Sequence, residues 1–310
     1  MNFSAVVSQV AMLGVIILLG FIVSATGYVN IRIKDSISKL IVKLILPCLI
    51  ISSISEKTFV PELAGELFAV FLMTLFCIFV MFLTGIFTAK LLRVPSPSQA
   101  VHKLLSSLGN VIFIGYPVIV AMYGEMGFFY AIIYWLVNDL FLWTVGVLMM
   151  SKRGGSKKAF LLKLFNPNTV AFAVALFMFF NGIKLPPVIA PAVEAVGELT
   201  VPLSMIFIGM ALSGVQLRSI FTKWWIFIIT PIKLIALPIL FIFIFKQFNI
   251  NEMIVGVVVL EAAMPAQTVL SILANEHKCD SDYAAIGMFV TTLVSLVTLP
   301  LVCRFIEMWL

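Results

Sequence analysis

The sequence predicts an all-helical membrane protein in which ten transmembrane helices form two inverted repeats of five. Composition is the first reason. Of the 310 residues, 62% are hydrophobic and 11% are charged, and the mean hydropathy is +1.17, so the chain lacks the polar surface of a soluble protein. The second reason is the presence of ten apolar segments long enough to cross a bilayer. The third is a polar connector near the middle of the chain, which leaves five segments on each side.

The first repeat is expected at 1–150. It begins with MNFSAVVSQV, which lacks the basic region and the small-residue cleavage site of a secretory signal, so the first span is expected to stay in the membrane. The five expected spans of this half are 6–28, 38–55, 66–90, 101–122 and 127–150.

The connector at 151–166, SKRGGSKKAFLLKLFN, contains Gly-Gly and several lysines, which are typical of a solvated linker. The second repeat is expected at 167–310. The four cysteines of the whole chain, two in each half, have no CxxC spacing, so they predict neither a disulfide framework nor a metal site. The five expected spans of this half are 167–182, 188–214, 223–246, 253–275 and 283–308.

Charge in the connectors predicts the orientation. The connectors after spans one, three, five, seven and nine and their flanks hold 15 of the 20 lysines and arginines, whereas most acidic residues lie on the opposite side. By the positive-inside rule, the basic side and the 151–166 linker are cytoplasmic and both termini are outside. The net charge of +6 therefore reflects topology in a multi-pass protein of the cell membrane. The sequence has no basic face with interleaved aromatic residues, so binding to nucleic acid is not expected.

Residue spacing supports a duplication. Pro47 and Pro202 are 155 residues apart, and Gly109 and Pro265 are 156 apart. Tyr130 and its counterpart at position 283 follow a similar offset of 153. Because each half has an odd number of spans, a duplicated half enters the membrane in the opposite direction, as in transporters with inverted repeats.

Two otherwise apolar segments are interrupted by glycine, proline and polar side chains: 107–118, SLGNVIFIGYPV, and 260–271, LEAAMPAQTVLS. A broken membrane helix is costly because its freed backbone groups find no water in hydrocarbon. A matched pair of such breaks predicts the binding site of a secondary transporter. The half-helices that begin at these breaks direct N–H groups and positive dipole ends toward a shared point, which suits a carboxylate.

The expected substrate-binding residues follow from these breaks. Asn110 and Gln267 can hydrogen-bond a carboxylate, and the alternative is that both amides only cap broken helices. Ser52 and Ser204, beside the kinking prolines, either face the substrate path or serve helix packing. The full expected set is Gly109, Asn110, Val111, Pro265, Ala266, Gln267, Ser52 and Ser204.

Ionisable residues deep in membrane spans are functional by default. Asp139 and Glu261 predict coupling to a cation, either as ligands of Na⁺ or as carriers of a proton, and the alternative is that a structural partner neutralises them. Lys233 is expected to attract the anion or to pair with one of these acids. His102 and His277 are expected to be solvated at span ends. The expected coupling residues are Asn138, Asp139, Glu261, Thr291 and Thr292.

Four stretches resemble the auxin efflux carrier family. SLGNVIFIGYPVIVAMYG, at 107–124, is similar to that family's fourth helix, and EAAMPAQTVLSILANEHKCD, at 261–280, to its ninth. NPNTVA, at 166–171, resembles the start of its second half, and VPLSMIFIGMAL, at 201–212, its seventh helix. These stretches occur in the expected order along the chain, from residue 107 to residue 280. The likeness is closer to compact prokaryotic members, known as malate or malonate permeases, than to plant carriers with a long central loop.

The resemblance implies a ten-helix fold with crossed, broken fourth and ninth helices, which is shared with the bile acid:sodium symporters. It also implies a scaffold made of helices 1, 2, 6 and 7, a mobile transport domain made of helices 3–5 and 8–10, and a homodimer. Glu261 departs from the amide of plant members and is similar to the acidic start of the ninth helix in the symporters. This difference favours cation coupling, with sodium and proton both left open.

The expected function is therefore secondary active transport of a small organic anion, such as malate, malonate or an auxin-like acid, by elevator-type alternating access. An uncoupled uniporter or a channel remains the alternative, and a channel is expected to have polar faces on several helices. An intramembrane enzyme is the weakest alternative, because motifs such as HExxH and GxSxG are absent from the sequence. No cofactor is expected other than a coupling ion, and the expected partners are the anion, the bilayer and a second copy.

Overall fold

The computed structural model describes residues 3–29, 32–55, 61–151, 167–214, 220–248 and 250–310. These residues form helices, with a single isolated β-bridge and no named strand among them. The all-helical class is thus confirmed for the described part of the chain. The expected connector at 152–166 lies outside it.

Seven helices of the described residues are long and apolar enough to cross a membrane. They are fewer than the ten expected spans because the helix Pro167–Phe180 is shorter than such a span and two other expected spans are interrupted. The segments expected at 101–122 and 253–275 are each divided into separate helices. The helical stretch from 111 to 150 is kinked at the boundary expected between 122 and 127, because the non-helical Gly124, with φ +65°, separates two helices there. The seven are Val7–Ala25, Ser36–Ser55, Leu63–Leu91, Val111–Met150, Ala190–Ser213, Ile226–Phe245 and Ser281–Trp309.

The chain divides into two compact units. One comprises the described residues of 15–68 and 156–214. Within it, α3 packs against α9 and α10, and α2 packs against α11. Helices α1 and α11 touch closely, because a Cβ on Gly209 would lie 2.0 Å from the Ile17 carbonyl oxygen. Its elements are α1 (Phe3–Ala25, from residue 15), α2 (Arg32–Leu40), η1 (Ile41–Ile45), α3 (Leu46–Ser55), α9 (Pro167–Phe180), α10 (Ala190–Glu198) and α11 (Thr200–Ser213).

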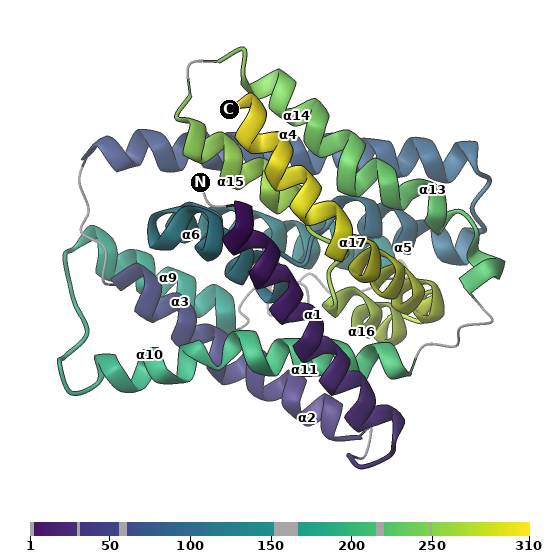
Figure 1. The fold of residues 1–310 in the computed structure, drawn as a ribbon, viewed down its shortest axis with the longest axis horizontal. Coiled ribbons are helices and arrows are strands. Elements are labelled where there is room, and N and C mark those ends of the chain that lie inside the picture. The colour runs from purple at the N-terminus through teal and green to yellow at the C-terminus, as the bar shows by residue number, and fades with distance from the viewer. Residues whose placement is uncertain (1–2, 30–31, 56–60, 152–166, 215–219, 249) are drawn as a thin grey trace. The chain divides into compact units, whose positions relative to one another are not determined.

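The other unit comprises the described residues of 1–14, 69–155 and 215–310. Helix α15 packs against α6 and α14, and α17 packs against α16 and α5. Figure 1 shows α15 and α16 as separate helices and α17 as one long helix. Its elements are α4 (Pro61–Leu91, from residue 69), α5 (Ser96–Ser107), η2 (Val111–Gly115), α6 (Tyr116–Phe141), η3 (Leu142–Gly146), α7 (Val147–Met150), η4 (Phe221–Lys223), α13 (Ile226–Pro231), η5 (Ile232–Ala236), α14 (Leu237–Phe245), α15 (Glu252–Ala262), α16 (Val269–Glu276) and α17 (Ser281–Trp309).

A buried polar network joins α4, α5 and α17 in this second unit. The expectation that His102 is solvated is wrong, because the residue is fully buried. Its Nε2 lies 2.9 Å from the Thr88 hydroxyl, and its Nδ1 lies 2.7 Å from the Tyr283 hydroxyl. Thr88 donates its own proton to the Thr84 carbonyl. The ring therefore donates from Nε2 and accepts from Tyr283 at Nδ1, which satisfies a neutral imidazole on both sides.

The N-terminus of α17 is capped by Asp280, which lies just outside the apolar span. The Tyr283 amide donates to its Oδ1 at 3.0 Å, and Lys223 and Ser98 both donate to its Oδ2 at 2.5 Å. Burial raises the pKa of the Asp280 carboxyl, but these hydrogen bonds and the Lys223 charge outweigh burial and hold the pKa below its usual value.

Asp280→Ala is expected to lower the free energy of unfolding at neutral pH by about 0.5 to 2 kcal/mol, the contribution of a helix N-cap. Because the folded pKa is lowered, the stabilisation is complete above the unfolded pKa of about 3.9 and is lost as the pH falls through the folded pKa. Thermal unfolding in detergent across this pH range measures both effects. Asp282→Ala, which changes an exposed neighbour in the same turn, is the control. A deficit that persists unchanged in acid would contradict the role of the charge.

Candidate functional site

Two helix breaks meet inside the unit that contains α5, α6, α15 and α16. Helix α5 ends at Ser107, and the chain is extended at Leu108, with φ −100° and ψ 128°, before η2 starts. Helix α15 ends at Ala262 and α16 starts at Val269. Gly109 and Ala266 form an antiparallel β-bridge between the two breaks.

Backbone groups freed by these breaks bond to each other. The Asn110 amide donates to the Pro265 carbonyl at 2.7 Å, and the Gly109 amide donates to the Asn138 Oδ1 at 3.3 Å. The Ala266 amide donates to the Thr291 hydroxyl at 3.0 Å. These bonds satisfy backbone N–H and C=O groups that would find no water in the hydrocarbon of the bilayer.

Glycine at position 109 permits this close approach. A Cβ there would lie 3.2 Å from the Met264 Cβ and 3.3 Å from the Glu261 carbonyl oxygen, which is tighter than ordinary van der Waals contact. Any side chain at this position would push the two breaks apart. Gly109, Pro265 and Ala266 thus contribute backbone groups to the junction, whereas Val111 starts η2 directly after it.

The amide side chains at the junction bond to neighbouring side chains. Asn110 donates to the Thr268 hydroxyl at 3.0 Å. Gln267 donates to the Asp139 Oδ1 at 3.2 Å and accepts from Asn138 at 3.5 Å. The structure thus brings together residues from α6 and from both breaks. Thr268 was missed by the sequence reasoning, although a hydroxyl directly after Gln267 was a usable signal.

Lys233 is buried beside the end of α5. Its Nζ donates to the carbonyls of Ser106 at 3.3 Å and Leu108 at 3.1 Å, and the side chain is 1% exposed. The structure places this ammonium on carbonyls instead of on Asp139 or Glu261. A cation is favourable there because the last carbonyls of a helix carry partial negative charge.

The expected coupling residues fall into two groups. Asn138, Asp139 and Thr291 belong to the hydrogen-bonded junction. Glu261 and Thr292 are also buried, but neither Glu261 carboxyl oxygen nor the Thr292 hydroxyl has a hydrogen-bond partner among the described residues. The carboxyl of Glu261 lies against the backbone of η2 at Gly115, where a Cβ would lie 2.7 Å from Oε2.

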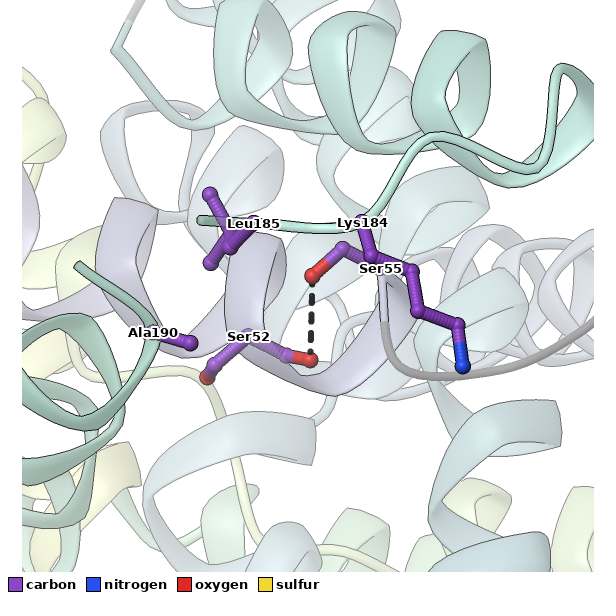
Figure 2. A pocket seen from close by; sticks show the side chains of 5 residues that line it. All are labelled: Ser52, Ser55, Lys184, Leu185 and Ala190. Atoms are coloured by element: carbon purple, nitrogen blue, oxygen red, sulfur yellow. Dashed lines mark hydrogen bonds between the residues drawn. The ribbon is translucent and has the colours of Figure 1, made fainter. Parts of the chain in front are cut away.

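Ser52 and Ser204 lie in the other unit. Ser52 lines a cavity of about 230 Å³ together with Ser55, Lys184, Leu185 and Ala190, and Figure 2 shows these five side chains. The Ser55 hydroxyl donates to the Ser52 carbonyl at 3.5 Å, and the Ser52 hydroxyl to the Leu49 carbonyl at 3.2 Å. Ser204 is buried in α11 and is not one of the lining residues. Lys184, which lines the cavity, was not among the expected site residues.

Comparisons with known proteins agree with a membrane transporter. A family model described as "Membrane transport protein" matches residues 5–303. An uncharacterized transporter of Methanocaldococcus jannaschii is 24% identical over 93% of this chain and 94% of its own length. An uncharacterized transporter of Methanothermobacter thermautotrophicus is 27% identical over the same shares of the two chains.

Proposed function

Since the chain belongs to the membrane transport protein family, the auxin efflux carrier family that its motifs resemble, we propose that it is a secondary active transporter of a small organic anion. The anion, a mono- or dicarboxylate such as malate, malonate or an auxin-like acid, binds where the two helix breaks meet. The single observation that carries this proposal is the pairing of Gly109 with Ala266. It joins two broken apolar segments and places amide side chains of both at one point.

The chemistry of this junction suits a carboxylate. The helical segment that starts at Val111 and helix α16 both begin at the breaks, so their positive dipole ends favour an anion there. Asn110, Gln267 and Thr268 already use their hydrogen-bonding groups on each other and on α6. A bound carboxylate exchanges these internal bonds for bonds to the ligand, without the cost of exposing an unpaired amide.

The division of the chain into two units supports alternating access. The unit with α2, α3 and α9–α11 corresponds to the proposed scaffold, and the unit with both breaks to the proposed transport domain. In this proposal ten membrane segments form two inverted repeats, the transport domain moves against a homodimeric scaffold, and both termini face outside the cell membrane. Within the scaffold unit, the cavity lined by Ser52, Ser55 and Lys184 offers a lysine and two hydroxyls, which suit an anion on their own.

Counterflow in proteoliposomes tests this function. Vesicles loaded with unlabelled malonate, malate or indole acetate are diluted into a trace of the labelled acid, and a carrier accumulates the label transiently and saturably. A channel gives flux that does not saturate and that internal substrate does not stimulate. Absence of counterflow for all carboxylates would contradict the proposal, whereas unsaturable flux would favour the channel.

A further inference from the structure

Glu261 is the buried acid that the hydrogen-bonded junction leaves out. It lies in the last turn of α15, four residues before Pro265, and is 0% exposed. Neither carboxyl oxygen has a hydrogen-bond partner among the described residues. A charged carboxylate in this position would cost many kcal/mol without a cation or several donors, whereas a neutral acid avoids this cost.

The charged groups around Glu261 have other partners. Helix α15 packs against η2, α6, α14 and α17, and neither η2 nor α14 carries an ionisable side chain. On α6, Tyr134 is buried, and Asp139 accepts from Gln267. Lys233, on η5, is held by two carbonyls of the α5 end.

Other ionisable side chains lie on α6 and α17. The Tyr123 hydroxyl of α6 lies against Gly256 of α15 and has no hydrogen-bond partner among the described residues, and on α17 Glu307 pairs with Arg304. At the start of α17, Tyr283 bonds to His102. Within the described residues, therefore, no cationic side chain faces the Glu261 carboxyl.

A hard cation is the alternative occupant of this site. Such ions take about six or more oxygen ligands, whereas in this structure the side-chain oxygens of Asn138, Asp139 and Gln267 accept N–H donors. On the side of Gly115, the Glu261 carboxyl contacts only backbone, because glycine has no side chain.

We propose that Glu261 is the proton-binding residue of this protein, because its carboxyl is enclosed against Gly115 with neither a hydrogen-bond donor nor a cation beside it. The inference rests on the proposed anion transport and names its coupling ion. The proton adds to a carboxylate oxygen from water on one side and leaves to water on the other side, in the same cycle as the anion. In the structure described here the carboxyl is enclosed and therefore carries the proton.

Gly115 links this carboxyl to the anion site. Its amide donates to the Asn110 carbonyl at 3.2 Å, while its Cα side contacts the carboxyl of Glu261. A movement of η2 that accompanies anion binding at Asn110 therefore also moves the wall of the proton site. This contact gives the two ligands a physical route of coupling.

Infrared difference spectroscopy tests the proton site without any substrate. The spectrum of each purified variant is subtracted from that of the unmodified protein. At neutral pH we expect the C=O band of a protonated, non-hydrogen-bonded carboxylic acid, and we expect its complete loss in Glu261→Gln. Glu252→Gln is the matched control, because it makes the same change on the exposed first turn of α15, and it should keep the band. A band that is absent from the unmodified protein, or lost in Asp139→Asn but not in Glu261→Gln, would overturn the proposal.

Gly115→Ala provides a second variant that keeps the acid. The added Cβ would lie 2.7 Å from Oε2, so the flexible end of Glu261 must move, and the band should shift in frequency. Gly65→Ala, at an exposed position with no atom within 4 Å of the added Cβ, should leave it in place. An unshifted band in Gly115→Ala would contradict the assignment.

The dependence of stability on sodium tests the alternative, a cation site at Glu261. Replacing sodium with choline should not change the thermal stability of the unmodified protein. A sodium-dependent stabilisation that disappears in Glu261→Gln would assign a cation site and overturn the proton assignment. Absence of carboxylate counterflow in a protein that shows the Glu261 band would instead contradict anion transport and leave the proton site standing.

Discussion

Asn110→Ala is expected to lower the affinity for the transported anion by about tenfold to a hundredfold. A hydrogen bond between an amide and a charged carboxylate contributes about 1.5 to 3 kcal/mol, and each 1.4 kcal/mol changes an affinity about tenfold. The residue lies at the start of the helical segment after the first break, and its side chain points to Thr268 of the second break. Isothermal titration calorimetry with malonate, or with whichever acid gives counterflow, measures the change.

The same substitution should leave the junction folded. Its main structural bonds are made by the backbone, since the Asn110 amide donates to the Pro265 carbonyl and the Asn110 carbonyl accepts from Ile114 and Gly115. Asn181→Ala is a suitable control, because it removes an exposed amide that only bonds to the Phe177 carbonyl at a helix end. Equal affinities in Asn110→Ala and the unmodified protein would show that the anion binds elsewhere, for example in the cavity at Ser52.

The sequence was most informative at residues that are unusual inside an apolar membrane helix. Glycine, proline and amides within apolar segments drew attention to 107–118 and 260–271, and the described helices end at Ser107 and at Ala262. Such residues act on their own backbone, through a missing N–H, a missing Cβ or a competing side chain. Their effect can therefore be predicted without knowledge of the neighbouring helices.

Contacts between helices were beyond this kind of reasoning. The rotation of a helix about its axis decides whether Lys233 meets a carboxylate or the carbonyls of α5, and apolar surroundings on every face leave no periodic pattern that specifies this rotation. His102 shows the same limit. Its position near a span end indicated solvent, whereas the packing of α4 and α17 buries it between Thr88 and Tyr283.

The number of spans illustrates a further limit. Hydropathy detects apolar composition, so it treated 101–122 and 253–275 as single segments although each contains a helix end. The boundary expected between 122 and 127, in contrast, coincides with the kink at the non-helical Gly124. Helix ends depend on where backbone hydrogen bonds find other partners, and those partners here lie about 155 residues away in the sequence.

Lys233→Met is expected to destabilise the protein by about 2 to 4 kcal/mol and to stop transport. The thioether replaces the ammonium at similar length, so packing is largely kept while both N–H donors are lost. The Ser106 carbonyl cannot continue the helix because the Asn110 amide donates to Pro265 instead, and the Leu108 carbonyl lies beyond the end of α5. A buried carbonyl without a donor costs about 1 to 3 kcal/mol, and the loss of a buried charge offsets part of that cost.

Thermal unfolding in detergent, with counterflow measured in parallel, checks the Lys233 prediction. Lys246→Met is the matched control, since Lys246 also donates to a helix-end carbonyl, that of Trp309 at 2.9 Å, but is exposed to solvent. Its loss should change stability little, because water can replace the bond. A Lys233→Met protein with unchanged stability but weakened anion affinity would mean that the ammonium serves the substrate and not the end of α5.

A double variant separates carbonyl capping from an ion pair. If Lys233 neutralised Glu261 in the membrane, Lys233→Met would leave an unpaired carboxylate, and adding Glu261→Gln would restore much of the lost stability. Because the ammonium bonds to Ser106 and Leu108 instead, we expect the two substitutions to be nearly additive. A strong rescue in the double variant would show that the lysine and the acid are partners after all. Additivity would place the positive charge at the end of α5, where it stabilises the break on which anion binding depends.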